Sequence, residues 1–252
     1  MTMGSIRTRQ ANLADSGWQA EVLHDLRGPL SVVRLQAQLL LRVATANAAS
    51  SDRSHDLALR VDRIERAVAQ MAGMLNELQD IGWSDGPLPT LRRERADVVE
   101  LARRIAEDRA DEAPEHSISV QAAQASLYGY WDVGRLERAI ANLVGNAVKY
   151  SPAGGEVILQ ILRERTTAGD HAAIAVRDTG IGIPDADLPH IFRRFYRAGN
   201  VAGRFDGAGL GLASARSIVE QHGGTVAVHS REGHGTTVIM RLPLELLQCV
   251  ER

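Results

Sequence analysis

Apolar residues in the first eighty positions recur at alternating steps of three and four. Such steps return each side chain to one face of a helix, and their sustained alternation is typical of long helices packed side by side. The sequence therefore predicts two long helices. The first ladder consists of Leu23, Leu26, Leu30, Val33, Ala37, Leu40 and Ala44, and the second of Leu57, Val61, Ile64, Val68, Met71, Leu75 and Leu78.

The polar, serine-containing residues 47–54 separate the two ladders and predict a helix-to-helix turn. Two helices bury too little apolar surface to be stable alone. We therefore expect two copies of the chain to pair as a homodimer with a four-helix bundle. An alternative is a hairpin that packs on the remainder of its own chain.

The pattern changes after the segment Gly82–Pro89, whose glycines and prolines indicate a linker. Helical stretches now alternate with short alternating runs that are typical of strands. We expect a helical hairpin over residues 1–82, a linker over 83–93 and an α/β sandwich over 94–248. The expected helices lie near 98–109, 133–150 and 210–222, and the expected strands near 117–120, 127–131, 156–163, 172–177, 225–230 and 236–242.

The expected helix 133–150 carries a column of polar side chains opposite its apolar stripe. Asn142, Asn146 and Lys149 follow each other at helical spacing, and Arg135 joins the same side. Amide oxygens are ligands for a hard cation, and the ammonium group attracts phosphates. A solvated polar face, which most amphipathic helices have, is the alternative interpretation.

Two glycine-rich segments follow. Asp178 ends an alternating strand, and Gly180 and Gly182 after it leave room for a flat base to approach the backbone. Gly207, Gly209 and Gly211 then open a helix, where free N–H groups favour phosphate. The spacing does not fit a dinucleotide-binding fingerprint, and the Walker pattern is absent. A plain turn is the alternative for either segment.

Composition limits the other classes of function. A formal charge of −2 gives no case for a nucleic-acid surface. The single cysteine, Cys249, excludes a disulfide framework and fits a reducing cytosol. No apolar run reaches the length of a membrane helix. We expect a cytoplasmic protein, or the cytosolic part of a longer or membrane-associated sensor.

Five motifs in a fixed order carry a resemblance to bacterial sensor histidine kinases, whose ATP-binding domain shares its Bergerat-type fold with gyrase, heat-shock chaperones and mismatch-repair ATPases. Residues 24–30, His-Asp-Leu-Arg-Gly-Pro-Leu, resemble the phosphoacceptor box, and residues 142–152 the asparagine box. Residues 178–184 and 207–212 are similar to the two glycine boxes, and residues 191–197 to the phenylalanine box. The resemblance implies ATP-dependent autophosphorylation of His24 and transfer to an aspartate of a response-regulator receiver domain.

The resemblance also implies roles at the nucleotide site. Asn146 would bind Mg²⁺, with Asn142 and Lys149 near the phosphates of ATP. Asp178 would recognise the adenine amino group, and residues 197–206 would form a mobile lid. The other implied contacts are Tyr150 packed on the nucleotide, Gly180 and Gly182 around the base, Gly207, Gly209 and Gly211 along the triphosphate, and Arg197 at the γ-phosphate.

His24 carries the chemistry that this resemblance requires. A neutral imidazole is a competent nucleophile at physiological pH. Asp25 would accept a hydrogen bond from one ring nitrogen and leave the other to attack phosphorus. Pro29 should kink the helix just past the histidine. The alternatives are a non-catalytic, nucleotide-binding dimeric scaffold, and an ATPase or serine-directed kinase of the same superfamily.

Gly28 departs from the family pattern, which often has Thr or Asn four residues after the phosphoacceptor. That side chain helps to position water for dephosphorylation of the partner, and glycine lacks it. We therefore predict weak or absent phosphatase activity, while a looser helix bend is the alternative role of Gly28. Only 23 residues precede His24, so we expect the input signal to come from another segment or a partner.

Overall fold

The computed structural model describes residues 28–40, 42, 52–81, 90–167 and 169–244. The chain divides into two compact units, Met1–Leu78 and Gln79–Arg252. No helix in the described ranges combines the length and apolar character needed to cross a membrane.

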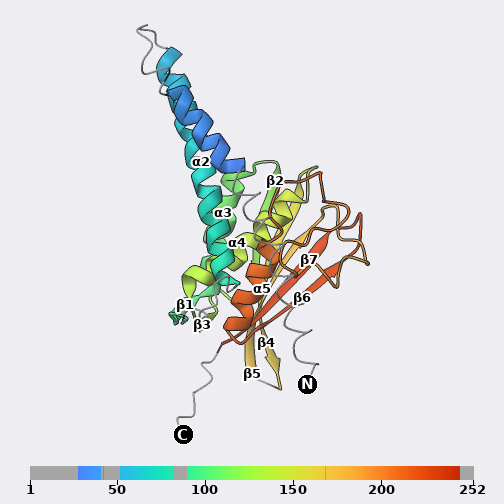
Figure 1. Ribbon diagram of the computed structural model, residues 1–252. Helices are drawn as coiled ribbons and strands as arrows, with labels where there is room; N and C mark the ends of the chain where they lie inside the picture. The colour runs from blue at the N-terminus through green and yellow to red at the C-terminus, as the bar shows by residue number, and fades with distance from the viewer. Residues whose placement is uncertain (1–27, 41, 43–51, 82–89, 168, 245–252) are drawn as a thin grey trace, which may run out of the picture. The chain divides into compact units, whose positions relative to one another are not determined.

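The first unit contains the two helices that the apolar ladders predict (Figure 1). Residues 28–40 are helical, and helix α2 spans Asp52–Asp80. The last two residues of α2 belong to the second unit. The predicted turn is therefore too long at its end, because residues 52–54 already belong to α2. Its first part, residues 47–51, lies outside the described residues, as does the segment Gly82–Pro89.

The first apolar ladder predicts only some of the buried positions of the first helix correctly. Val33 and Leu40 are half-buried, but Leu30 and Ala37 are exposed. The buried position between Val33 and Leu40 is Gln36, whose amide oxygen accepts a hydrogen bond from Arg60 of α2 at 3.4 Å. The apolar pattern predicts that Ala37 is buried, but Gln36 is buried instead. This polar residue is tolerated because the hydrogen bond satisfies its amide oxygen.

The second unit is built on a five-stranded mixed sheet with the order β2-β4-β5-β7-β6. Strands β2 and β4 are parallel, and every other neighbouring pair is antiparallel. A separate antiparallel pair joins β1 and β3. The strands are β1 (Glu94–Asp97), β2 (His116–Ala122), β3 (Tyr128–Trp131), β4 (Gly155–Thr166), β5 (Gly169–Asp178), β6 (Thr225–Ser230) and β7 (Thr236–Pro243).

Three helices cover one face of this sheet: α3 (Val98–Glu112), α4 (Val133–Lys149) and α5 (Gly211–Gln221) (Figure 1). Aspartates start two of them. The carboxylate of Asp97 accepts the backbone N–H of Val99 at 3.0 Å, and that of Asp132 accepts the N–H of Arg135 at 3.2 Å. These caps satisfy N–H groups that have no partner inside a helix.

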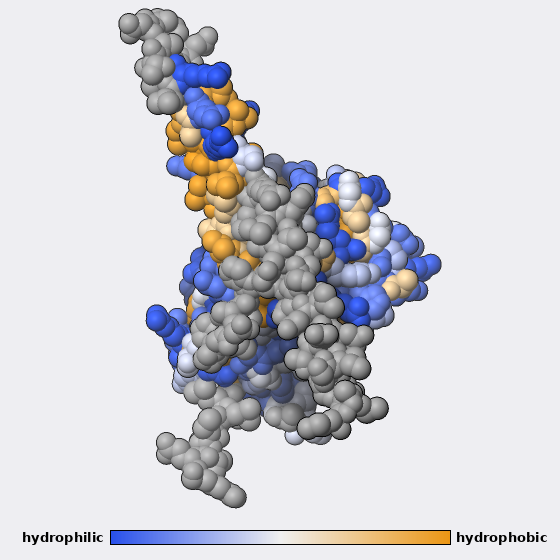
Figure 2. All heavy atoms as spheres, in the orientation of Figure 1, coloured by the Kyte–Doolittle hydropathy of each residue, from blue (hydrophilic) through white to orange (hydrophobic). Residues whose placement is uncertain are grey.

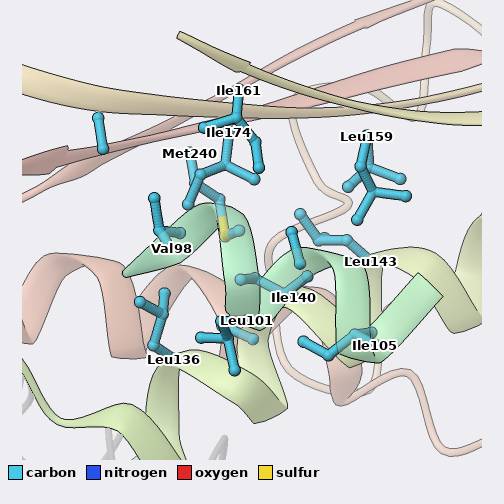
Figure 3. Close-up of a cluster of buried hydrophobic side chains, with 14 of the residues drawn as sticks. Val98, Leu101, Ile105, Leu136, Ile140, Leu143, Leu159, Ile161, Ile174 and Met240 are labelled. Atoms are coloured by element: carbon cyan, nitrogen blue, oxygen red, sulfur yellow. The ribbon is translucent and has the colours of Figure 1, made fainter. Parts of the chain in front are cut away.

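The core lies between the helices and the sheet (Figure 3). The apolar stripe of α4 points into this layer, where the side chains of Leu136, Ile140 and Leu143 are almost fully buried. The core also contains Val98, Leu101 and Ile105 of α3, and Leu159, Ile161, Ile174 and Met240 of the sheet. The stripe thus fixes which face of α4 is left for the candidate site.

The predicted order of helices and strands in this unit is confirmed, with shifts of a few residues at element ends. The missed strand is β1, which has only four residues, Glu-Arg-Ala-Asp. Charged residues of this kind carry no strand signal, and pairing with β3 supplies the strand geometry. Mixed helices and sheet over the chain agree with the predicted α plus α/β fold class.

Candidate functional site

Helices α4 and α5 run antiparallel, as two contacts at different heights show. Near the start of α4, Arg135 donates to the side-chain oxygen of Gln221 at the end of α5. Halfway along α4, the amide nitrogen of Asn142 lies 3.4 Å from the carbonyl oxygen of Gly211, the first residue of α5. The second half of α4 therefore faces the glycine segment that precedes α5. Arg135 is buried two turns away from it.

Lys149 brings a positive charge to the same glycine segment. It is the last residue of α4, and its ammonium group donates to the carbonyl oxygen of Asp206. A Cβ atom at Gly207 would lie 2.7 Å from the Lys149 nitrogen. Lys149 and the Gly207–Gly211 segment, which the sequence predicts at one site, are thus side by side.

The start of α5 suits an anion. Its N-cap position is Leu210, whose side chain makes no capping hydrogen bond. N–H groups of an uncapped first turn and the positive end of the helix dipole favour phosphate oxygens. With Asn142 and Lys149 beside it, this end of α5 gathers hydrogen-bond donors and a positive charge, which suit an anionic ligand.

Asp178 ends β5 and is held by backbone groups from two sides. Its Oδ1 atom accepts the N–H of Gly180 at 2.9 Å and the N–H of Thr236 at 3.1 Å. Within the described residues its Oδ2 atom makes no hydrogen bond, which leaves it for a donor on a ligand. Burial raises the pKa of Asp178, while the two N–H groups lower it. The orientation of this carboxylate is therefore fixed before any ligand arrives.

Gly180 and Gly182 let neighbouring segments of backbone meet. A Cβ atom at Gly180 would lie 2.2 Å from the carbonyl oxygen of Tyr150, which follows α4. Gly182 has a φ of +64°, and a Cβ atom there would lie 2.1 Å from the carbonyl oxygen of Arg231. Since any side chain would collide, the first glycine box is packed between the end of α4 and the β6–β7 turn.

The segment between the phenylalanine box and α5 closes on itself. The N–H of Phe195, which has a φ of +61°, donates to the carbonyl oxygen of Gly209 at 3.0 Å. Inside this loop, Arg197 donates to the carbonyl oxygens of Val201 and Phe205. The ring of Phe205 meets the ring of Tyr150 edge to face, with centroids 5.2 Å apart. Tyr150 thereby contacts the expected lid, and Arg197, the first residue of that lid, is held by hydrogen bonds within it.

Three hydrogen bonds that no sequence motif predicts connect this loop to the first glycine box and to Asp187 just after it. The carboxylate of Asp187 accepts the Tyr196 hydroxyl at 2.6 Å and the N–H of Gly199 at 2.9 Å. The amide nitrogen of Asn200 donates to the carbonyl oxygen of Gly182 at 2.9 Å. The Tyr196 hydroxyl lowers the pKa of Asp187, because it favours the ionised carboxylate. We call Asp187, Tyr196, Gly199 and Asn200 the loop clasp.

The structure thus brings together eleven of the thirteen predicted site residues in the second unit. They are Asn142, Asn146, Lys149, Tyr150, Asp178, Gly180, Gly182, Arg197, Gly207, Gly209 and Gly211. His24 and Asp25 lie outside the described residues, so their predicted roles stay predictions. Gly28 is described: it is exposed and helical, and a Cβ atom there would meet nothing within 4 Å.

Comparison with known proteins gives two family matches. A family model described as the His Kinase A (phospho-acceptor) domain matches residues 16–87. A second, described as histidine kinase-, DNA gyrase B-, and HSP90-like ATPase, matches residues 131–246. The first match overlaps the expected helical hairpin, and the second falls within the expected α/β sandwich.

Curated relatives and solved structures agree with these matches. Sensor histidine kinase WalK of Bacillus subtilis is 33% identical over 228 residues, which are 89% of this chain and 36% of the relative. The histidine-protein kinase/phosphatase MprB of Mycobacterium leprae is 31% identical over 94% of this chain and 44% of the relative. The solved structure of a mycobacterial MprB matches with a TM-score of 0.53 and 28% identity over 62% of this chain and 99% of that one. Acinetobacter baumannii AdeS, at 20% identity and a TM-score of 0.57, shares the fold over 88% of this chain and 98% of its own.

The chain spans about a quarter to a half of the length of the curated relatives that it matches. Over that span, the phosphoacceptor match, the ATPase match and the geometry of the glycine boxes point the same way. The chain belongs to the sensor histidine kinase family of bacterial two-component systems.

Proposed function

We propose that this chain is an ATP-dependent protein-histidine kinase that phosphorylates itself on His24 and passes the phosphoryl group to an aspartate of a response regulator. The observation that carries the proposal is the placement of Asp178. Its Oδ1 atom is fixed by two backbone N–H groups, and its Oδ2 atom is left for the exocyclic amine of adenine. An acceptor prepared in this way suits a base with an amino group.

We assign the residues around Asp178 to different parts of the nucleotide. Gly180 and Gly182 shape the base pocket, and Tyr150 packs on the nucleotide. Asn142, Lys149 and the start of α5 hold the phosphates, supported by their contacts at Gly211 and Gly207. Gly207, Gly209 and Gly211 line the triphosphate, and Arg197 is proposed for the γ-phosphate once its hydrogen bonds to Val201 and Phe205 are exchanged.

Mg²⁺ fits the oxygen donor of Asn146, one turn after Asn142 on α4. This ion takes one or two protein ligands and completes its shell with water and phosphate oxygens. A side-chain amide oxygen beside the phosphate donors satisfies that preference. When bound, Mg²⁺ would offset negative charge on the phosphates.

The proposed transfer forms one bond and breaks one. A nitrogen of the His24 imidazole attacks the γ-phosphorus in line, while the bond between that phosphorus and the β–γ bridging oxygen breaks and leaves ADP. Asp25 accepts a hydrogen bond from the other ring nitrogen, which fixes the tautomer. Lys149 offsets charge on the phosphates. In the later transfer, a carboxylate oxygen of the response-regulator aspartate attacks the phosphorus, and the bond between that phosphorus and the His24 nitrogen breaks.

The test is incubation of the full chain with ATP labelled at the γ-phosphate. We expect a label on the protein that acid removes and alkali does not, and its loss in His24→Gln and in Asn146→Ala. The matched control is His229→Gln, which removes an exposed histidine of β6 and should leave the label unchanged.

Each alternative function has its own result in this assay. Bound nucleotide without any label would indicate a dimeric scaffold that sequesters a regulator. An acid-stable label that persists in His24→Gln would indicate a serine-directed kinase, and release of inorganic phosphate without a label would indicate an ATPase. Any of these results would overturn the proposal.

The proposal includes weak phosphatase activity because Gly28 offers no side chain to position a water. MprB relatives carry the name kinase/phosphatase. The variant Gly28→Thr tests whether a side chain at this position increases phosphatase activity. A Cβ atom fits at Gly28 without contact, and we expect this variant to release phosphate from a phosphorylated response regulator faster than the parent chain. Gly28→Ala controls for the gain in helix stability, about 1 kcal/mol for a glycine replaced in a helix. Equal release by the parent chain would contradict the prediction.

We also propose that the chain forms a homodimer and is located in the cytosol. The exposed apolar side chains of the first unit support the dimer. The single cysteine supports the location.

A further inference from the structure

Asp80 is a buried acidic residue that none of the roles above uses. It is the last residue of α2 and belongs to the second unit. Its side chain is only 2% exposed. The C-terminus of a helix is the negative end of its dipole, and burial penalises a charged carboxylate. An aspartate at such a position therefore needs strong partners.

The main partner of Asp80 is Arg138 of α4. The Nε atom of Arg138 donates to Asp80 Oδ2 at 3.0 Å, and its Nη2 atom donates to Oδ1 at 2.8 Å. This two-pronged arrangement is the strongest geometry between a guanidinium and a carboxylate. The hydrogen bond with Asp80 raises the pKa of Arg138.

Helix α5 completes the environment of Asp80. The hydroxyl of Ser214 lies 3.4 Å from the Asp80 carboxylate. The backbone carbonyl of Asp80 accepts the Ser217 hydroxyl at 2.7 Å and the Gln221 amide at 2.8 Å. The carbonyl of the next residue, Ile81, accepts a hydrogen bond from Arg194. We call Asp80 and Ile81, with these partners, the helix-end anchor.

Three of these partners, Arg138, Ser214 and Arg194, lie close in sequence to residues on the phosphate side of the candidate site. Arg138 is one turn before Asn142 on α4, and Ser214 is one turn after Gly211 on α5. Arg194 precedes Phe195, whose N–H closes the loop on Gly209. Asp80 is thus bonded to both helices whose spacing sets the distance between Asn142 and Gly211.

We propose that Asp80 is a positioning residue for the phosphates of ATP, acting through the helix-end anchor. Its carboxylate and carbonyl hold α4 and α5 at the spacing that places Asn142, Lys149 and the start of α5 around one triphosphate. Asp178 lies at the end of β5 and is bonded to Gly180 and Thr236, outside this network. Loss of the anchor should therefore weaken phosphate contacts more than base contacts.

This inference rests on the proposed nucleotide site and is tested by binding, so that histidine phosphorylation need not be assumed. A fluorescent ATP analogue is bound to the full chain and displaced by unlabelled ATP or by adenosine. The variants are Asp80→Asn, which removes one acceptor, and Arg138→Lys, which keeps the positive charge and loses the two-pronged geometry. The matched control is Glu137→Gln, which breaks an exposed ion pair with Arg104 at the neighbouring position of α4.

We expect the Kd for ATP to rise about tenfold or more in both variants, because small displacements of positioned groups have large effects. The Kd for adenosine should stay within about twofold, and Glu137→Gln should match the parent chain. A general loss of packing would weaken both ligands, so the ratio of the two affinities separates positioning from a purely structural role.

Circular dichroism and thermal unfolding establish which variants are folded. If Asp80→Asn does not fold, Arg138→Lys decides the question. Folded variants with an unchanged Kd for ATP, or with equal losses for ATP and adenosine, would overturn the inference. A parent chain that binds no nucleotide would instead overturn the proposed function.

Discussion

At the scale of single residues, Asp178 shows a conflict between stability and binding. Its carboxylate is partly buried, and burial raises its pKa above the ordinary value. The folded protein therefore holds the proton more tightly than the unfolded chain does. Stability from this difference is present at low pH and is lost as the pH rises through the folded pKa.

Asp178→Asn should thus bind ATP poorly without loss of fold. Asparagine keeps an oxygen for the N–H groups of Gly180 and Thr236, but it presents an amide nitrogen to the adenine amine. A lost hydrogen bond to a charged group costs about 1.5–3 kcal/mol, and we expect the Kd for ATP to rise accordingly. Calorimetric titration measures the affinity, and urea unfolding at neutral pH should show a free energy no lower than that of the parent chain.

Unchanged affinity for ATP in Asp178→Asn would contradict this prediction. If Asp178→Asn binds ATP as tightly as the parent chain, the Oδ2 atom does not recognise the base. Asp170→Asn serves as a comparison, because Asp170 also lies on β5 but forms an ion pair with Arg163. That change should not affect nucleotide affinity.

Asp187, in the loop clasp, should affect how long nucleotide stays bound. Asp187→Asn has only one good acceptor for the two donors at Tyr196 and Gly199, so the loop should open more often. We expect nucleotide to dissociate roughly two to ten times faster, the range that one hydrogen bond covers. Stopped-flow displacement of a fluorescent ATP analogue measures the rate.

The control for the loop clasp is Asp185→Asn, an exposed carboxylate in the same segment. An equal acceleration in both variants would mean that negative charge near the loop, and not the hydrogen bonds of Asp187, sets the rate. Tyr196→Phe should reproduce part of the Asp187→Asn effect, because it removes one of the two donors.

The motif residues of the site were predictable, whereas their supporting residues were not. Asn142, Lys149 and Asp178 stand in sequence motifs, and the resemblance of those motifs to a known family implies their roles. Asp187 and Asp80 stand in no such motif, because the fold and not a local spacing supplies their partners. For Asp187 those partners, Tyr196 and Gly199, are 9 and 12 residues away in the same irregular segment. For Asp80 those partners are 58 and 134 residues away in the sequence, and only the folded chain brings them together.

At the scale of elements, the periodicity of α4 predicts both its buried stripe and its polar column. In a long amphipathic helix, the apolar positions and the polar positions each indicate which face is buried. Strand β1 shows the opposite case. Four largely charged residues become a strand only through pairing with β3, and no local pattern contains that information.

His222, the C-cap residue of α5, joins the end of α5 to Asp132 at the start of α4. Its Nδ1 atom donates to the Ile218 carbonyl at 2.7 Å, and its Nε2 atom accepts the N–H of Asp132 at 2.9 Å. Burial is the main cause that lowers the pKa of His222, and the nearby Arg93 and Arg135 lower it further. Bonds with Ile218 and the charge of Asp132 act in the opposite direction.

The sign of the effect on stability follows from this lowered pKa. The unfolded chain takes up the proton first, at an ordinary pKa of 6.5. Neutral His222 therefore stabilises the fold fully above that pH, and its contribution is lost as the pH falls from there toward the folded pKa. We expect the free energy of unfolding in urea to fall between about pH 7.5 and about pH 5.5.

His222→Gln should show a shallower dependence of unfolding free energy on pH over the same range, because glutamine does not titrate. His229→Gln, an exposed histidine of β6, should keep the slope of the parent chain. Equal slopes in the parent chain and His222→Gln would show that other groups cause the pH dependence.

At the scale of the whole molecule, the first unit exposes apolar side chains that a helical hairpin does not cover by itself. Val61, Val68 and Leu75 of α2 are 42%, 47% and 43% exposed and stand seven residues apart. Leu30 and Leu35 of the first helix are more than half exposed. Figure 2 shows apolar side chains gathered on this unit. A heptad row of this kind is the seam of a helical bundle, so we expect it to be buried in a homodimer.

The substitutions Val68→Lys and Leu75→Lys together test the dimer. Symmetry removes four apolar side chains from the interface, which weakens association by roughly 6 kcal/mol at about 1.5 kcal/mol for each. The paired control is Ala69→Lys with Asn76→Lys, two exposed positions next to the row and also seven residues apart. Sedimentation equilibrium should give a monomer for the first pair and a dimer for the second. If both pairs remain dimeric, the contact lies elsewhere. If the parent chain is itself monomeric, the row is covered within one chain and the alternative of an intramolecular hairpin holds.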